Sequence, residues 1–201
     1  GLVQFKRVEG DREAHARRLV KEVGLSEDAI YRYPHEFSGG QRQRINIARA
    51  ISMRPDFIVC DEAVSALDVS IQAQVINLLL SLQEAYHLAY LFISHDLSVV
   101  SNIADRVAVM YLGRIVEIGR TSDIIHDPLH PYTRVLIAAV PVPGEEKLKQ
   151  RMRIKGEAPS SADPPAGCRF HPRCPEAMPV CRQQDPPKRE IHGRSVWCHL
   201  Y

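Results

Sequence analysis

The sequence lacks three features that mark membrane-spanning, secreted and nucleic-acid-binding proteins. Its longest apolar runs, such as 135–140, are a few residues long, far shorter than an apolar helix that crosses a bilayer. Its first residues contain neither the apolar segment nor the small-residue cleavage site of a signal peptide. Its 26 basic and 24 acidic residues leave a net charge of +2, which does not predict a nucleic acid as partner. We therefore expect a cytosolic protein.

Cysteine and proline are scarce in most of the chain and concentrated near its end. Of five cysteines, Cys60 lies in an apolar run and the other four are Cys168, Cys174, Cys181 and Cys198. Ten of the fourteen prolines follow residue 140. This change in composition predicts a boundary between residues 140 and 144, with a regular domain before it and a loop-rich extension after it.

Apolar periodicity before that boundary predicts an alternation of helices and strands. Helical patterns cover 11–23, 25–32, 41–54, 69–85 and 97–104, with short helices beginning at 121 and 132. Strand patterns cover 57–60, 89–94, 106–111 and 114–118. The first two strands are continuously apolar, which is typical of parallel strands buried on both faces. The sequence therefore predicts an α/β fold with a parallel sheet.

A glycine pair precedes the helix predicted after residue 40. Ser38 is of the type that caps a helix N-terminus by accepting a hydrogen bond from a first-turn amide. Gly39 and Gly40 have no side chains, so an anion could approach their backbone closely. Exposed amides and the positive end of the helix dipole form a phosphate site. An ordinary capped helix is the alternative explanation.

Polar residues follow the two apolar strands, where ligands bind in open α/β sheets. Asp61 and Glu62 end the first strand, where they would suit a magnesium site and a base that orients water. His95 follows the second strand and could donate a hydrogen bond to a phosphate. The alternatives are two solvated loop acids and a structural histidine. Asp68 lies between the strands, and capping of the next helix alone would explain it.

These motifs occur in one order: Phe-Ser-Gly-Gly-Gln-Arg-Gln-Arg, four apolar residues with Asp-Glu, Ser-Ala-Leu-Asp, and Ile-Ser-His-Asp. Over residues 11–120 the order resembles the ATP-binding subunit of an ABC transporter, from its signature motif onward. The resemblance implies that the signature loop, with Phe37 in place of the commoner Leu, contacts ATP through Ser38, Gly39, Gly40 and Gln41. It also implies that Asp61 serves the Mg²⁺ site, that Glu62 is catalytic, that Asp68 belongs to the D-loop (65–68), and that His95 is the switch histidine.

Further segments resemble the dipeptide and oligopeptide importer branch of that family. They are 61–74, the His-Pro-Tyr-Thr motif at 130–133 together with 140–143, and the segments 156–160 and 164–168. Within the first of these segments, Ala63 lies where the branch usually has Pro. The resemblance implies an ATPase subunit that energises peptide import, peripheral at the cytoplasmic face of the cell membrane. Its partners would be a second identical or homologous ATPase subunit and two membrane permeases, with no nucleic acid and no direct contact with the peptide.

One motif of the family is missing from the chain. None of the eleven glycines is followed by lysine, so there is no Walker A loop, Gly-x-x-x-x-Gly-Lys-Ser or Thr, to hold the phosphates of ATP. We therefore expect the C-terminal portion of a subunit, through truncation rather than loss of function. Residues 1–120 would be the C-terminal part of the ATPase domain, and 121–201 the importer-type extension. In the family each ATP lies between two subunits, so this chain would supply its signature loop to a partner's ATP and hydrolyse little ATP alone.

The four cysteines of the extension, Cys168, Cys174, Cys181 and Cys198, are spaced Cys-x5-Cys-x6-Cys-x16-Cys. This proline-rich segment has little apolar periodicity with which to form its own core, so a cross-link or a metal would help it fold. A cytosolic setting disfavours disulfides, and four thiolates suit zinc or an iron-sulfur cluster. His171 and His199 leave mixed ligation of zinc open, and unligated structural thiols are a third alternative. Some members of the branch carry an iron-sulfur cluster at similar cysteines, so the resemblance favours a 4Fe-4S cluster. Cys60 is excluded as a buried hydrophobe.

Two other functions are weighed against peptide import. One is a non-transport ABC ATPase, which the His-Pro-Tyr-Thr segment and the position of the cysteine tail disfavour. The other is a non-enzymatic metal-binding or regulatory module derived from an ATPase. The presence of Glu62 and His95 disfavours that module, because it would need neither residue.

Overall fold

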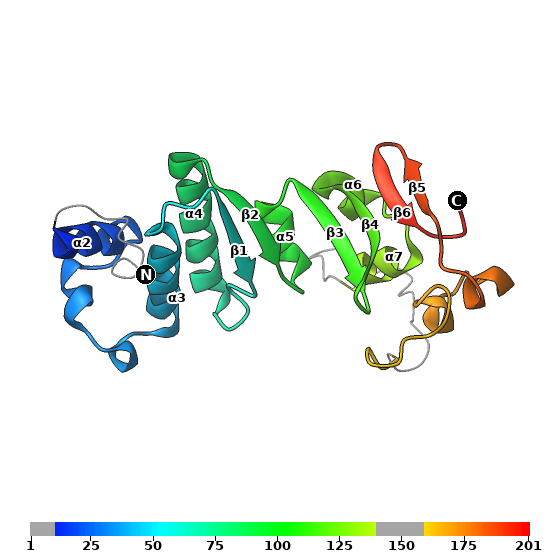
Figure 1. Cartoon of the computed structure of the whole chain (residues 1–201), viewed down its shortest axis with the longest axis horizontal. Helices are drawn as coiled ribbons and strands as arrows, with labels where there is room; N and C mark the ends of the chain where they lie inside the picture. The colour runs from blue at the N-terminus through cyan, green and yellow to red at the C-terminus, as the bar shows by residue number, and fades with distance from the viewer. Residues whose placement is uncertain (1–10, 140–158) are drawn as a thin grey trace. The chain divides into compact units, whose positions relative to one another are not determined.

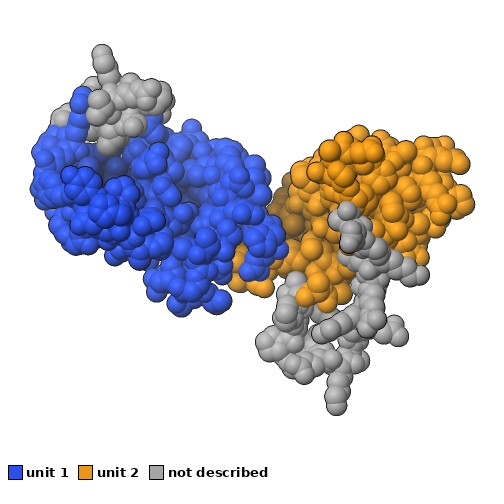
Figure 2. Space-filling view, turned by 90° about the horizontal axis from the view of Figure 1, so that it is seen from below, with its two compact units in different colours: residues 1–96 blue, residues 97–201 orange. Residues whose placement is uncertain are grey.

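The computed structural model describes residues 11–139 and 159–201. The chain divides into two compact units, Gly1–Asp96 and Leu97–Tyr201, which are coloured separately in Figure 2. The boundary predicted between residues 140 and 144 lies outside the described residues, and so do residues 156–158, part of one segment on which the family resemblance rests.

The first unit is built mainly from helices that flank a pair of strands. Its helices are α2 (Arg12–Glu22), the 3-10 helices η1 (Glu27–Tyr31) and η2 (Pro34–Glu36), α3 (Gly39–Ile51) and α4 (Val69–Tyr86). Asp11 caps α2 by accepting hydrogen bonds from two backbone amides. The helix predicted over residues 25–32 is observed as the shorter 3-10 helix η1. The predicted helix over 41–54 begins two residues earlier and ends at Ile51, and Arg54 then takes a positive φ of 48°.

Strands β1 (Phe57–Asp61) and β2 (Ala89–Ile93) pair in parallel, which confirms the predicted parallel sheet. Figure 1 shows α4 between α3 and β1, and the hydroxyl of Tyr90 in β2 donates to the carbonyl of Leu79 in α4 at 2.9 Å. The face that carries Tyr90 is therefore covered by α4. The opposite face carries apolar side chains that are about half exposed: Phe57 (54%), Val59 (54%), Leu91 (49%) and Ile93 (44%). The sequence predicts that β1 and β2 are buried on both faces. Within the part of the chain that the structure describes, only the face against α4 is covered.

The second unit contains an antiparallel sheet with the strand order β3-β4-β6-β5. Its strands are β3 (Arg106–Tyr111), β4 (Arg114–Arg120), β5 (Lys188–Ile191) and β6 (Arg194–Trp197). Its helices are α5 (Leu97–Ile103), α6 (Thr121–His126) and α7 (Pro131–Ala138), with 3-10 helices η3 (His171–Arg173) and η4 (Pro179–Arg182). Strand β6 pairs with β4 through Glu117↔Val196 and Ile118↔Ser195. The end of the chain therefore extends a sheet that begins at residue 106.

The hairpin of β5 and β6 was not among the predicted strands. Its turn residues His192 and Gly193 both have positive φ, at 48° and 76°. Two such residues are what a tight two-residue hairpin turn requires, because their twist matches that of the flanking strands. A His-Gly pair between short polar stretches is a weak sequence signal, and this explains why the hairpin is missed.

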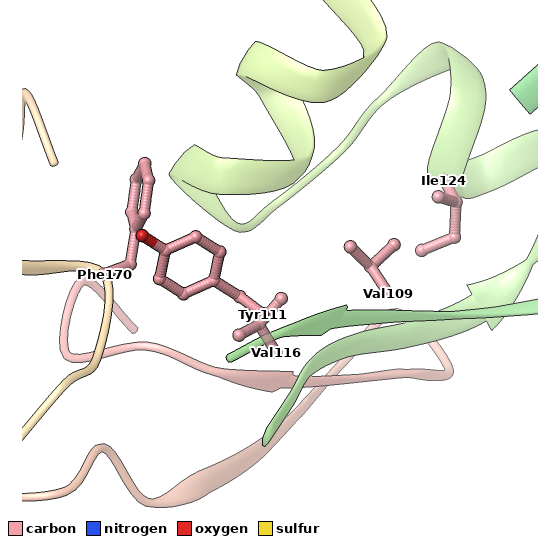
Figure 3. Close-up of a cluster of buried hydrophobic side chains, with 5 residues drawn as sticks. All are labelled: Val109, Tyr111, Val116, Ile124 and Phe170. Carbon is pink, nitrogen blue, oxygen red and sulfur yellow. The ribbon is translucent and has the colours of Figure 1, made fainter. Parts of the chain in front are cut away.

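The core of the second unit joins the β3–β4 hairpin to the cysteine-rich segment. It contains the buried side chains of Val109, Tyr111, Val116, Ile124 and Phe170 (Figure 3). The rings of Tyr111 and Phe170 meet edge to face with their centroids 5.2 Å apart, a favourable geometry for aromatic pairs. Phe170 is 1% exposed and lies two residues after Cys168. The cysteine-rich segment is therefore anchored on the sheet by an aromatic side chain.

Among the described residues, no helix combines the length and the apolar character that a bilayer crossing requires.

Candidate functional site

The predicted phosphate site at the start of α3 is a helix N-terminus with a capping box. The backbone amide of Gln41 donates to Ser38 Oγ at 3.3 Å, and the amide of Ser38 donates to Gln41 Oε1 at 3.0 Å. This reciprocal pair fixes the first turn of α3, and it confirms the predicted cap. Phe37, just before the cap, is buried, which fixes the entry of the chain into the helix. Gly39, at the first helical position, is exposed.

The carboxylates predicted at the end of β1 lie at the end of that strand and are exposed. Asp61 is the last residue of β1, and Glu62 follows with a positive φ of 46°. The left-handed region is unfavourable for a residue with a Cβ, and it occurs where the surrounding structure enforces it. Here the amide of Glu62 donates to the carbonyl of Ile93 in β2 at 3.0 Å. The position of Glu62 is thus set by the neighbouring strand.

His95 and Glu62 are brought together across the two strands. His95 Nδ1 lies 3.4 Å from Glu62 Oε1, and both side chains are largely exposed. The structure therefore places two of the predicted residues in one site at the carboxyl ends of β1 and β2. This is the position at which an open parallel sheet binds ligands.

Asp68 caps α4, as its position in the sequence predicts. Its Oδ1 atom accepts hydrogen bonds from the hydroxyl of Ser70 at 2.7 Å and from the amide of Ile71 at 3.0 Å. The hydrogen bond from Ser70 is the main cause that lowers the pKa of Asp68, and the amide of Ile71 adds to it. The capping role is established by these contacts, whereas a contact of Asp68 with nucleotide stays a prediction.

The four cysteines of the second unit are free thiols, and two of them, Cys168 and Cys174, pack against the aromatic core. Cys181 and Cys198 are buried, and Cys168 and Cys174 are partly buried. The amide of Cys168 donates to the carbonyl of Cys181 at 2.9 Å, so two of the four are paired through their backbones. The pKa of Cys198 is raised to about 11, mainly by burial and to a smaller extent by the nearby thiols of Cys168, Cys174 and Cys181.

These four cysteines fall short of a formed metal site. Among residues 11–139 and 159–201, no three side chains of His, Cys, Asp or Glu are grouped so as to hold a metal ion. His171 Nδ1 lies 3.0 Å from the carbonyl oxygen of Cys168, and His199 Nε2 lies 3.0 Å from that of Gln184. One nitrogen of each predicted zinc-ligand histidine is therefore engaged by the backbone. Cys60 lies in β1 of the other unit, where burial raises the pKa of its thiol.

A buried polar network at the start of α7 was not predicted from the sequence. The carboxylate of Glu117, which is 0% exposed, accepts hydrogen bonds from the amides of Leu129 and His130, each at 2.9 Å. His130 caps α7, because its Nδ1 accepts from the amide of Tyr132 at 3.0 Å. Burial lowers the pKa of His130 to about 4, with a smaller contribution from the charge of Arg134. The His-Pro-Tyr-Thr motif is thus the capped start of a helix that is bound to β4.

Two arginines connect this network to the end of the chain. Arg134 in α7 donates to Glu176 at 2.9 Å and to the hydroxyl of Tyr201 at 3.0 Å. Arg194 in β6 is 3% exposed and forms an ion pair with Asp127 at 2.9 Å. A glutamate in the apolar run Ile-Val-Glu-Ile at 115–118 is the one sequence signal that could have indicated a buried acid. The two arginines carry no comparable signal.

Two families of known proteins match the chain, each over about a third of it. The family described as "ABC transporter" matches residues 3–65, which include the start of α3 and both carboxylates after β1. The family described as "Oligopeptide/dipeptide transporter, C-terminal region" matches residues 116–181, which include the His-Pro-Tyr-Thr motif and three of the four clustered cysteines.

Individual proteins that are similar to this chain have names that agree with both families. The putative oligopeptide transport ATP-binding protein YkfD of Bacillus subtilis (strain 168) is 56% identical over 91% of this chain and 56% of its own length. The oligopeptide transport ATP-binding protein AppF of the same organism is 55% identical over 95% of this chain and 59% of its own length. The chain thus spans somewhat more than half the length of these relatives.

A solved structure shows a similar fold. It is the crystal structure of the ADP conformation of MJ1267, an ATP-binding cassette of an ABC transporter. It matches with a TM-score of 0.52 and 29% identity, over 63% of this chain and 52% of that one.

Proposed function

Since the chain belongs to the ATP-binding proteins of ABC transporters, in their oligopeptide and dipeptide branch, we propose that it forms part of an ATPase that energises peptide import. The observation that carries this proposal is the pairing of Glu62 and His95 at the carboxyl ends of two parallel strands. A carboxylate beside a histidine can orient a water molecule and hold a terminal phosphate.

Each residue of the site has a role in this proposal. Glu62 accepts a proton from the attacking water, and His95 holds the γ-phosphate and keeps the Glu62 carboxylate in place. Asp61 ends the same strand with an exposed carboxylate, a hard oxygen ligand that suits Mg²⁺. When bound, Mg²⁺ neutralises part of the charge on the phosphates of ATP. The backbone between Ser38 and Gln41 binds the phosphate of an ATP that is held by another subunit.

The apolar face of β1 and β2 supports the proposal that this chain acts together with more of an ATPase fold. Parallel strands are normally covered on both faces, and here Phe57, Val59, Leu91 and Ile93 leave one face half exposed. The chain also has no Gly-Lys sequence that could form a phosphate-gripping loop. We therefore propose that ATP turnover requires a phosphate-gripping loop that residues 1–201 do not supply.

The partners and the location follow from the same proposal. A second ATPase subunit, identical or homologous, would complete the ATP site, and two membrane permeases would carry the peptide. The chain would lie at the cytoplasmic face of the membrane without touching the peptide or any nucleic acid. Residues 1–120 would belong to the ATPase domain and 121–201 to the importer-type extension.

The cysteine-rich segment would hold a 4Fe-4S cluster in this proposal, with zinc as the alternative. The support is chemical: the thiols of Cys168, Cys174 and Cys181 lie close enough to Cys198 to contribute to its raised pKa, and thiolates are soft ligands that suit iron-sulfur clusters and zinc. The four thiols are free, so they are available as ligands for either group, although in the described residues they are not grouped so as to hold a metal ion. A cluster or zinc, when bound, would supply a cross-link between Cys168, Cys174, Cys181 and Cys198.

ATP turnover tests the proposed activity. The transporter assembled with this chain should release phosphate from ATP, and peptide should stimulate the release when the permeases and a binding protein are present. The 201-residue chain by itself should show no turnover above buffer. Steady turnover by the isolated chain, or none by the assembled transporter, would contradict the proposal.

A further inference from the structure

The start of α3 packs against the start of α4 at its second glycine. A methyl group placed on Gly40 would lie 2.6 Å from Cγ2 of Ile71, far closer than the optimal separation of about 3.5–4.0 Å between carbon atoms. A methyl group on Gly39 would lie 3.6 Å from Cδ2 of Leu67, which is an ordinary contact. Packing therefore requires glycine at position 40 and tolerates a small side chain at position 39.

Ile71 has little freedom to move away from Gly40. It is the third residue of α4, and its amide donates to the capping carboxylate of Asp68 at 3.0 Å. Isoleucine is branched at Cβ, so in a helix its χ1 angle is almost confined to one rotamer, which fixes Cγ2. A clash at Gly40 would therefore displace a whole helix end rather than rotate a side chain.

The helix end that Ile71 occupies is connected to the carboxylates after β1. Gln72 Nε2 donates to the carbonyl of Val64 at 2.9 Å, and the hydroxyl of Ser65 donates to the carbonyl of Glu62 at 3.1 Å. A continuous set of contacts thus runs from Gly40 through Ile71 and Gln72 to Glu62. All of its members lie in the first unit.

We propose that Ile71 is a positioning residue that fixes the signature loop relative to the Asp61–Glu62 carboxylates by filling the space beside Gly40. The inference rests on the proposed ATPase function, because in that function the signature loop and Glu62 face different ATP molecules. The signature loop contacts the ATP held by the partner subunit, and Glu62 acts at the ATP site on its own side of the two-subunit assembly. Ile71 would therefore hold the two half-sites of one chain at a fixed separation.

Thermal unfolding of the 201-residue chain tests the packing without any nucleotide. Gly40→Ala should lower the melting temperature by roughly 5 °C, whereas Gly39→Ala should leave it unchanged or raise it, because alanine favours a helix more than glycine does. In the Ile71→Ala background, Gly40→Ala should no longer lower the melting temperature. An equal loss in both backgrounds, or no loss with Ile71 present, would overturn the inference.

Turnover by the assembled transporter tests the positioning. Ile71→Ala should lower kcat for ATP about tenfold with a smaller change in KM, because it changes the separation of the signature loop and Glu62, whereas the ATP that the loop contacts is held mainly by another subunit. Ile71→Val keeps a Cγ2 methyl and should retain wild-type kcat. Gly40→Ala should be more impaired than Gly40→Ala/Ile71→Ala. If the double variant melts normally and remains as inactive as Gly40→Ala, the added methyl group obstructs the nucleotide directly and the inference is wrong.

The two proposals fail in different ways. If the wild-type transporter does not hydrolyse ATP, the proposed function fails while the melting cycle still decides whether Ile71 and Gly40 are coupled. If the wild type turns over ATP and the melting cycle shows no coupling, only the positioning role of Ile71 fails.

Discussion

Nδ1 of His95 lies 3.4 Å from a carboxylate oxygen of Glu62, although the two residues are 33 positions apart in the chain. The parallel pairing of β1 and β2 produces this contact, since Asp61 and Ile93 are partners at the ends of the two strands. Glu62 directly follows β1 and His95 lies two residues after the end of β2, so both lie at the same edge of the sheet. The contact thus follows from strand register, and it joins the two groups on which the proposed reaction depends.

Replacement of either partner should abolish turnover without unfolding the chain. Glu62→Gln removes the proton acceptor, and His95→Ala removes the group beside it, so each should lower kcat of the assembled transporter about 10²–10⁴-fold. Both side chains are largely exposed, so circular dichroism and the melting temperature should stay close to those of the wild type. Glu84→Gln, an exposed substitution on α4, is the matched control and should keep full activity. Wild-type turnover in Glu62→Gln would exclude Glu62 as the base.

Glu117→Gln should destabilise the second unit. The carboxylate accepts one backbone amide with each oxygen, and an amide side chain can replace only one of these acceptors while placing an N–H group against the other donor. Two buried groups would then lack partners, at a cost of about 1–3 kcal/mol in the free energy of unfolding. Urea titration measures this difference. Glu176→Gln, which alters a partly exposed ion pair with Arg134, should cost much less.

The stability of the second unit should fall as the pH is lowered from about 6.5 to 4. His130 has a pKa of about 4 in the folded chain and an ordinary value of 6.5 when unfolded, so between these values the unfolded state binds the extra proton. Folding stability is therefore complete above pH 6.5 and decreases by an amount on the order of 3 kcal/mol toward pH 4.

A pair of histidine variants isolates this effect from the titration of carboxylates. His130→Asn keeps a side chain that can cap α7 and removes the titrating ring, so its unfolding free energy should depend less on pH in that range. His126→Asn changes an exposed histidine of the same unit and should leave the wild-type pH dependence intact. Identical pH profiles for wild type and His130→Asn would contradict the assignment.

Protein purified without oxygen should contain iron and acid-labile sulfide, at about four of each per chain. Cys181→Ser should remove most of both and lower the melting temperature, because Cys181 is buried and its backbone is paired with that of Cys168. Cys60→Ser is the control, since its thiol lies in β1 of the other unit, and it should leave iron unchanged. A colourless protein with one zinc would favour the zinc alternative, and a metal-free folded protein would favour structural thiols.

The elements of the first unit were largely predictable because their signals are local. The apolar spacing of α3 and α4, and the capping types of Ser38 and Asp68, are read from a few neighbouring residues. The carboxyl ends of β1 and β2 then place Asp61, Glu62 and His95 at one edge. The exposed side of β1 could not be predicted, because continuous apolar strands indicate burial without showing what covers them.

The second unit was less predictable because its structure depends on contacts between distant residues. Pairing of β4 with β6 joins Glu117 to Val196, and no local pattern announces it. Phe170 in the proline-rich segment is fully buried because Tyr111 and Tyr132 pack around it, 59 and 38 positions earlier in the sequence. Buried Arg194 likewise owes its environment to Asp127. Such residues resemble surface residues until the tertiary contacts are known.

The strand order β3-β4-β6-β5 sets a time order for the maturation of the nascent chain on the ribosome. Strand β4 is made early, yet its second neighbour, β6, does not exist until residue 197 has been synthesised. Until then one edge of β4 has unpaired backbone groups that can bind another chain. The sheet therefore closes only after β6 has been made, through a pairing of residues far apart in the sequence, such as Glu117 and Val196.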